Sequence, residues 1–253
     1  MPSTEDLGMS PRRVLHVFYV LDTSGSMEGT RIAMLNKAMG ETTMTLCQQA
    51  EKNADAIIKL AVLEFNSGCR WMQPKGPEEM QDFIWNDLSA GGLTDMGEAL
   101  KELNDKLSES AFLSSDTGNY LPIIIFMTDG YASDDYLKEL KKIQKNKWFA
   151  RGIKIGFAIG DDPDRKMIAD VVGDSSAVIT TEDLSEFARQ LCFVSVTSTM
   201  LGSRSRTSQN TLTGRDVVIQ AMEEELVPKE SVDPDIPYVI PDEQDLEDFD
   251  DSF

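Results

Sequence analysis

The sequence contains very little histidine and cysteine. Its one histidine is His16, and its three cysteines, Cys47, Cys69 and Cys192, are far apart and match no metal-binding spacing. Zinc sites and serine hydrolases depend on these residue types, so both are disfavoured. An odd number of distant thiols fits a reduced cytosol, where we expect buried, unpaired cysteines. His16 lies inside an apolar run, so we expect core burial or solvation at a sheet edge rather than catalysis.

The chain also lacks long apolar runs and an excess of basic charge. No run approaches the ~18 residues that a membrane helix needs. Residues 1–13 contain no apolar segment of a secretory signal, so we expect a cytoplasmic protein. The formal net charge is −20 over 253 residues. Such a charge argues against nucleic acid or an anionic membrane as the main partner, because both require basic patches.

A domain boundary is predicted near residue 203. Residues 203–253 hold 14 acidic and 4 basic residues, which gives a net charge of −10, half of the total. The segment is first rich in Ser and Thr, then acidic and interrupted by Pro, and it cannot bury enough apolar surface to order itself. We therefore expect an N-terminal extension over residues 1–11, a globular domain over 12–202 and a flexible acidic tail over 203–253.

Apolar runs alternate with helical periodicity across residues 12–202. This alternation predicts an α/β fold with a doubly wound, mostly parallel central sheet flanked by helices. Strands are predicted at 14–21, 57–65, 69–72, 121–129, 153–160 and 177–180, with 69–72 antiparallel to its predecessor. Helices are predicted at 29–52, 96–107, 164–172 and 182–200, and another is predicted with Ser133 or Asp134 as its N-cap. Residues 79–88 contain a short amphipathic segment.

Polar residues gather in three loops of this predicted fold. The first strand runs into DTSGS at 22–26, the loop GGLTD at 91–95 opens a helix, and a later strand runs into TDG at 128–130. In doubly wound sheets, ligands bind at the carboxyl ends of the strands. Carboxylate and hydroxyl oxygens without Cys or His favour Mg²⁺ or Mn²⁺ over Zn²⁺. A site with few charges leaves the ion electrophilic, so that a partner could supply another anionic oxygen.

Three enzyme classes fit the first loop less well. A phosphate-binding P-loop requires a Lys at the helix start, and residues 22–31 contain none. A haloacid-dehalogenase-like phosphatase would have a second Asp at position 24, where this chain has Ser24. A serine hydrolase requires a positioned histidine base. A non-enzymatic binding module is therefore the leading hypothesis, and a metal-dependent phosphatase or hydrolase is the alternative.

The pattern of Asp22, Ser24, Ser26, Thr94 and Asp129 resembles the metal-ion-dependent adhesion site of von Willebrand factor A domains. The resemblance covers roughly residues 12–200. It implies that Ser24 and Ser26 coordinate Mg²⁺ or Mn²⁺ directly, and that Asp22 and Asp129 act directly or through water. Thr94 would bind by either route, depending on the conformational state. A Glu or Asp of a protein partner would fill the open position.

A narrower resemblance concerns two stretches, FIWNDLSAGGLTDMGEAL and PIIIFMTDGYASDDY. Both are similar to the bacterial TerY-type tellurium-resistance proteins. This resemblance implies a role in tellurite or stress resistance, or in phospho-signalling, together with a Ser/Thr kinase and a PP2C-type phosphatase.

Two hypotheses concern the acidic tail. It could be a phosphorylation target, with Thr207, Thr211 and Thr213 as candidate sites. Phosphorylated Thr213, followed by an Asp three residues later, would resemble a ligand of a forkhead-associated domain. Alternatively, an acidic residue within 242–251 could occupy the open position of the metal. We expect Asp95 to support the threonine loop and not to be a ligand.

Overall fold

The computed structural model describes residues 11–160, 163–181, 184–204 and 220. A seven-stranded sheet forms the centre, with the order β3-β2-β1-β5-β6-β7 and β4 paired to β2. The strands are β1 (Arg13–Asp22), β2 (Ala56–Asn66), β3 (Gly68–Trp71), β4 (Glu78–Glu79), β5 (Ile123–Thr128), β6 (Ile153–Ile159) and β7 (Val178–Thr181). Only β3 and β4 run antiparallel to their neighbour β2. The predicted α/β fold with a mostly parallel sheet is confirmed.

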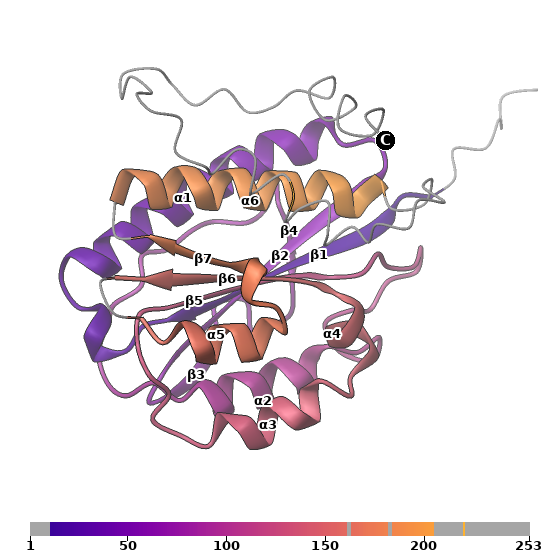
Figure 1. Cartoon of the computed structure of the whole chain (residues 1–253). Coiled ribbons are helices and arrows are strands. Elements are labelled where there is room, and N and C mark those ends of the chain that lie inside the picture. The colour runs from indigo at the N-terminus through magenta and orange to yellow at the C-terminus, as the bar shows by residue number, and fades with distance from the viewer. Residues whose placement is uncertain (1–10, 161–162, 182–183, 205–219, 221–253) are drawn as a thin grey trace, which may run out of the picture.

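Helices cover both faces of the sheet (Figure 1). They are α1 (Thr30–Lys52), α2 (Met96–Lys106), α3 (Tyr136–Ile143), α4 (Lys147–Arg151), α5 (Arg165–Val172) and α6 (Leu184–Arg204), with short 3-10 turns η1 (Gly25–Met27) and η2 (Ser175–Ala177). The helices α1 and α6 lie on one face, and α2 to α5 lie on the other. None of the described helices is both long and apolar enough to cross a membrane.

The strand β1 is buried on both faces, which explains its uninterrupted apolar sequence. Leu15, Val17 and Tyr19 pack into the core beneath α1 and α6, whereas Phe18 and Val20 pack into the core beneath α2. His16 is 1% exposed, so the expectation of core burial is confirmed.

Several details differ from the sequence prediction. Residues 79–88, predicted only as a short amphipathic segment, contain the end of β4 followed by turns. The helix expected to have Ser133 or Asp134 as its N-cap begins at Tyr136, with Asp135 at the N-cap position, and is followed by the separate helix α4. Asn146 separates the two, because its side chain accepts a hydrogen bond from Trp148 N and donates one to the carbonyl of Leu107.

Four further expectations are only partly met or concern residues outside the described ones. The three cysteines are free, as expected, but each is half-buried and not fully buried. The helix α6 extends to Arg204, beyond its predicted end at residue 200. The candidate phosphorylation sites Thr207, Thr211 and Thr213, and the acidic residues at 242–251, lie outside the described residues.

Candidate metal centre

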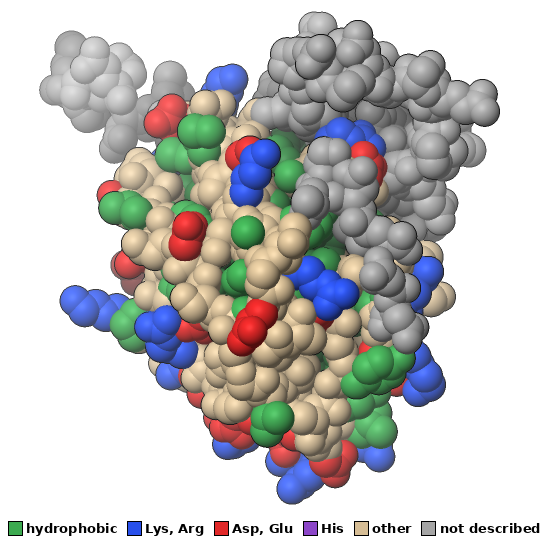
Figure 2. Space-filling model, turned by 90° about the vertical axis from the view of Figure 1, so that its left-hand side faces the viewer, with side chains coloured by type: hydrophobic (Ala, Val, Ile, Leu, Met, Phe, Trp, Pro, Cys, Tyr) green, Lys and Arg blue, Asp and Glu red, His purple; other side chains and the backbone are tan. Residues whose placement is uncertain are grey.

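Two adjacent parallel strands end together at the centre of the sheet. Asp22 is the last residue of β1, and Asp129 follows Thr128, the last residue of β5. The chain leaves β1 towards β2 on one side, while β5 lies on the other, so this is a topological switch point. The face formed by the carboxyl ends of the strands carries only scattered acidic, basic and hydrophobic side chains (Figure 2).

Asp22 is held rigidly at the bottom of the site. Its Oδ1 accepts a hydrogen bond from Ser24 N at 2.7 Å, and its Oδ2 accepts one from Thr128 Oγ1 at 2.5 Å. The side chain is fully buried, and burial raises the pKa of Asp22 above its ordinary value. The hydrogen bonds from Thr128 and Ser24 lower the pKa, and the nearby charge of Asp129 raises it. Asp22 therefore orients the loop and supplies negative charge from below.

The hydroxyl groups of the first loop lie between the two carboxylates. Ser24 Oγ and Ser26 Oγ are 3.0 Å apart, and Ser26 Oγ donates to Asp129 Oδ1 at 2.7 Å. A Cβ built on Gly130 would lie 3.3 Å from Ser26 Oγ and 3.8 Å from Thr94 Oγ1, so Thr94 also reaches this point. The structure thus brings together all five residues that the sequence proposes as ligands.

Thr94 is positioned by a loop that sequence reasoning did not identify. Ser133 Oγ accepts a hydrogen bond from Thr94 N at 3.0 Å, and Ser133 N donates to the Thr94 carbonyl at 2.8 Å. Ser133 Oγ in turn donates to Asp95 Oδ1 at 2.9 Å, and Asp95 Oδ2 accepts from Gly68 N at 3.0 Å. Asp95 therefore braces the threonine loop, in the role expected for it.

Asp134, expected at the start of its own helix, serves another one. Its carboxylate accepts hydrogen bonds from Gly97 N at 2.9 Å and Glu98 N at 3.1 Å, in the first turn of α2. An acceptor at this position satisfies backbone donors that the helix leaves free. The loop after β5 thereby fixes the helix that begins immediately after Thr94.

Glycines allow the first loop and the threonine loop to approach closely. Gly25 N donates to the carbonyl of Gly92 at 3.0 Å, and Gly91 N donates to the carbonyl of Thr23 at 2.8 Å. Gly92 has a φ of +87°, and a Cβ there would lie 2.7 Å from Ser67 Oγ. A side chain at this position would push the threonine loop away from Ser67, in the turn between β2 and β3.

Arg31 is a second residue that the sequence analysis missed. Its Nη1 donates to Asp129 Oδ2 at 2.7 Å and to the carbonyl of Ser26 at 3.1 Å. No motif spacing points to it, because it lies in the first turn of α1 and reaches back over the loop.

The donor set fits a small, hard cation. Within the described residues, no cluster of three or more His, Cys, Asp or Glu side chains could hold a metal ion. The group assembled here instead combines two carboxylates with three hydroxyls, a set of hard oxygen donors of the kind that Mg²⁺ and Mn²⁺ prefer.

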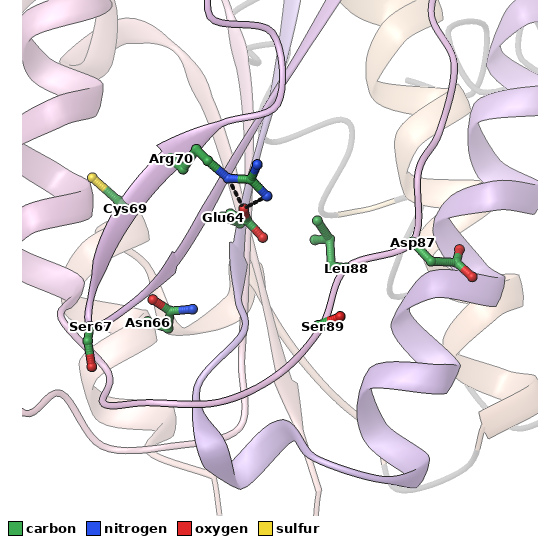
Figure 3. A pocket seen from close by; sticks show the side chains of 8 residues that line it. All are labelled: Glu64, Asn66, Ser67, Cys69, Arg70, Asp87, Leu88 and Ser89. Atoms are coloured by element: carbon green, nitrogen blue, oxygen red, sulfur yellow. Dashed lines mark hydrogen bonds and ion pairs between the residues drawn. The ribbon is translucent and has the colours of Figure 1, made fainter.

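A polar pocket of about 470 Å³ lies between the end of β2, β3 and the segment 87–89 (Figure 3). Its lining comprises Glu64, Asn66, Ser67, Cys69, Arg70, Asp87, Leu88 and Ser89. Asn66 donates to Thr23 Oγ1 at 3.3 Å, and Ser67 Oγ accepts from Leu93 N at 2.9 Å. The pocket therefore shares a wall with the loops of the candidate metal site.

A family model for the von Willebrand factor type A domain matches residues 16–191. The chain belongs to this family. Von Willebrand factor A domains are commonly metal-dependent protein-interaction modules. No curated protein matches the chain.

Solved structures with the same fold include several von Willebrand factor A proteins. Proximal thread matrix protein 1 of the mussel byssus, solved with a zinc-occupied MIDAS motif, is 19% identical with a TM-score of 0.54, over 71% of this chain and 46% of that one. A von Willebrand factor type A protein from Catenulispora acidiphila is 17% identical with a TM-score of 0.52, over 74% and 42% of the two chains.

The ArnB paralog VWA2 from Sulfolobus acidocaldarius is 15% identical with a TM-score of 0.52, over 72% and 45% of the two chains. The matched region spans less than half the length of each of these three proteins. At these identities, the likeness establishes the fold.

Proposed function

We propose that the chain is a non-enzymatic protein-binding module that works through Mg²⁺ or Mn²⁺. The observation that carries the proposal is the convergence of two carboxylates and three hydroxyls from three separate loops. Asp22, Ser24, Ser26, Thr94 and Asp129 would hold the ion, and a partner's Asp or Glu would complete its coordination. When bound, the ion supplies a Lewis-acidic point of attachment for that carboxylate.

Three of the chain's own features support binding over catalysis. His16, its only histidine, is buried in β1 six residues before Asp22 and does not line the site. Ser26 is exposed, so a ligand can approach from solvent. Leu93 and Tyr131, next to Thr94 and Gly130, are 59% and 61% exposed and offer apolar contact beside the site.

The first test is calorimetric titration of the purified chain with Mg²⁺ and with Mn²⁺. We expect Ser26→Ala to weaken binding by about tenfold, because it removes one hydroxyl from the donor set. Ser110→Ala, another exposed serine that lies outside the site, is the matched control. Absence of binding by the unmodified chain, or equal affinity in Ser26→Ala, would contradict the proposal.

We further propose a biological setting for the module. The TerY-like stretches favour a bacterial stress-resistance system that includes a Ser/Thr kinase and a PP2C-type phosphatase. Phosphorylation at Thr207, Thr211 or Thr213 would make the tail a ligand for a forkhead-associated domain. Mass spectrometry of the chain after co-expression with such a kinase tests this part, and an unmodified tail would rule it out.

A further inference from the structure

The guanidinium of Arg31 lies against the carboxylate that closes the candidate metal site. Arg31 Nη1 is 2.7 Å from Asp129 Oδ2 and 3.1 Å from the carbonyl oxygen of Ser26. The Asp129 side chain is fully shielded from solvent, whereas that of Arg31 is 37% exposed. A charge-assisted hydrogen bond to a shielded carboxylate is stronger than an exposed surface pair. One oxygen of Asp129 therefore serves Arg31, and the other accepts the hydroxyl of Ser26.

The fold provides a specific place for this guanidinium. Gly160 follows β6 with a φ of +99°, and a Cβ built there would lie 2.9 Å from Arg31 Nη2. The guanidinium thus packs on bare backbone at the end of β6 while it contacts the loop after β5. Only glycine leaves enough room at this point without strain.

The position of Arg31 on its helix is unfavourable for stability. It lies in the first turn of α1, where the helix dipole favours anions, and this turn contains no acidic residue. The contact with Asp129, and not the stability of α1, therefore accounts for a cation at this position.

Charge counting then links Arg31 to the ion. Asp22 and Asp129 contribute two negative charges, and Arg31 compensates one of them. Glu28 lies near Gly91 across the loop, but it is exposed and its charge is screened by solvent. A divalent cation would leave the centre with a net positive charge of about one. That excess charge attracts a partner carboxylate, and it also makes the ion itself bind less tightly.

We propose that Arg31 is a positioning residue that weakens metal binding in order to keep the ion electrophilic toward a partner's carboxylate. The inference rests on the proposed function and deepens it. Removal of the positive charge should have opposite effects on the two affinities. The site should bind the ion more tightly, and the bound ion should bind a carboxylate more weakly. A purely structural role predicts the reverse for the metal, because a damaged site binds an ion more weakly.

The test is Mn²⁺ titration of the full chain and three variants, each checked for folding by circular dichroism. Arg31→Gln removes the charge, Arg31→Lys keeps it, and Lys37→Gln removes the same charge from a 77% exposed position on α1. We expect Arg31→Gln to bind Mn²⁺ about tenfold more tightly, because the repulsion between the guanidinium and the divalent ion is lost, and the other two to stay within about twofold of the unmodified chain. Equal or weaker binding by Arg31→Gln would overturn the inference.

A second titration replaces chloride by acetate at the same ionic strength. A carboxylate that binds the ion tightens Mn²⁺ binding by linkage. We therefore expect acetate to increase the Mn²⁺ affinity of the unmodified chain more than that of Arg31→Gln. An equal gain would refute the claim about electrophilicity. If neither chain binds Mn²⁺, the proposed function fails and this inference fails with it, whereas equal affinity in the two chains contradicts the role of Arg31 alone.

Discussion

The buried His16 should make the protein lose stability in mild acid. Its ring is 1% exposed, and its Nδ1 has no hydrogen-bond partner among the described residues. Burial, and to a lesser extent the positive charge of Lys59 opposite it on β2, together lower the pKa of His16 from 6.5 to about 3. The folded protein therefore keeps this imidazole neutral at pH values where the unfolded chain protonates it.

The sign and size of the effect follow from proton linkage. Between pH 6.5 and about 3, the unfolded state binds one more proton at His16 than the folded state. The stability is complete above pH 6.5 and decreases as the pH falls toward 3. With these two pKa values, the free energy of unfolding decreases by about 2 kcal/mol between pH 7.5 and pH 5.

The assay is urea unfolding followed by circular dichroism at pH 7.5, 6.5, 5.5 and 5, with chelator present, for the unmodified chain and His16→Leu. Leucine has a similar volume and cannot titrate, and it removes the unpaired nitrogen, so its stability at neutral pH should be equal or higher. Carboxylates titrate in both proteins and cancel in the difference. If the difference between the two proteins changes by less than about 1 kcal/mol over this range, the assigned pKa shift is wrong.

Three other substitutions test the packing around the site by urea unfolding. Asp134→Ala should cost about 1–2 kcal/mol, because it removes the acceptor of two backbone N–H groups at the start of α2; unchanged stability would contradict that capping role. Gly156→Ala should cost about 1–3 kcal/mol, since its Cβ would lie 2.1 Å from Ile168 Cγ2, and Ile168→Ala in the same chain should restore part of the loss. Arg70→Gln should cost about 1 kcal/mol, because it leaves Glu64, which is 8% exposed, without its ion pair. Adding Glu64→Gln should restore this stability, and additive losses would argue against coupling between the two side chains.

The sequence was sufficient to predict the mostly parallel sheet and the convergence of the polar loops at its edge, because both depend on local patterns. An uninterrupted apolar run such as 14–21 has few alternatives to a strand buried on both faces. Polar residues directly after such runs must lie at the carboxyl edge once the strands are parallel, so Asp22 and Asp129 could be placed near each other without coordinates.

The supporting contacts could not be predicted, because they join segments that are far apart in the chain. Ser133 lies 39 residues from the threonine it holds, and Arg31 lies 98 residues from Asp129. The start of α3 was misplaced for the same reason. Asp134 is a residue type that commonly caps the helix that follows it. Its carboxylate instead accepts two hydrogen bonds from α2, and the helix that follows it in the chain begins at Tyr136.

These distant contacts also explain how the site can be rigid although its donor groups carry little net charge. Asp22 is fixed by Thr128 and Ser24, Thr94 is fixed by Ser133, and Asp129 is fixed by Arg31 and Ser26. Hydrogen bonds within the protein therefore hold the donors in position. A preorganised site can use neutral hydroxyls and a half-compensated pair of carboxylates and still recognise a cation. In the function that we propose, the charge left on the ion would hold the acidic residue of a partner.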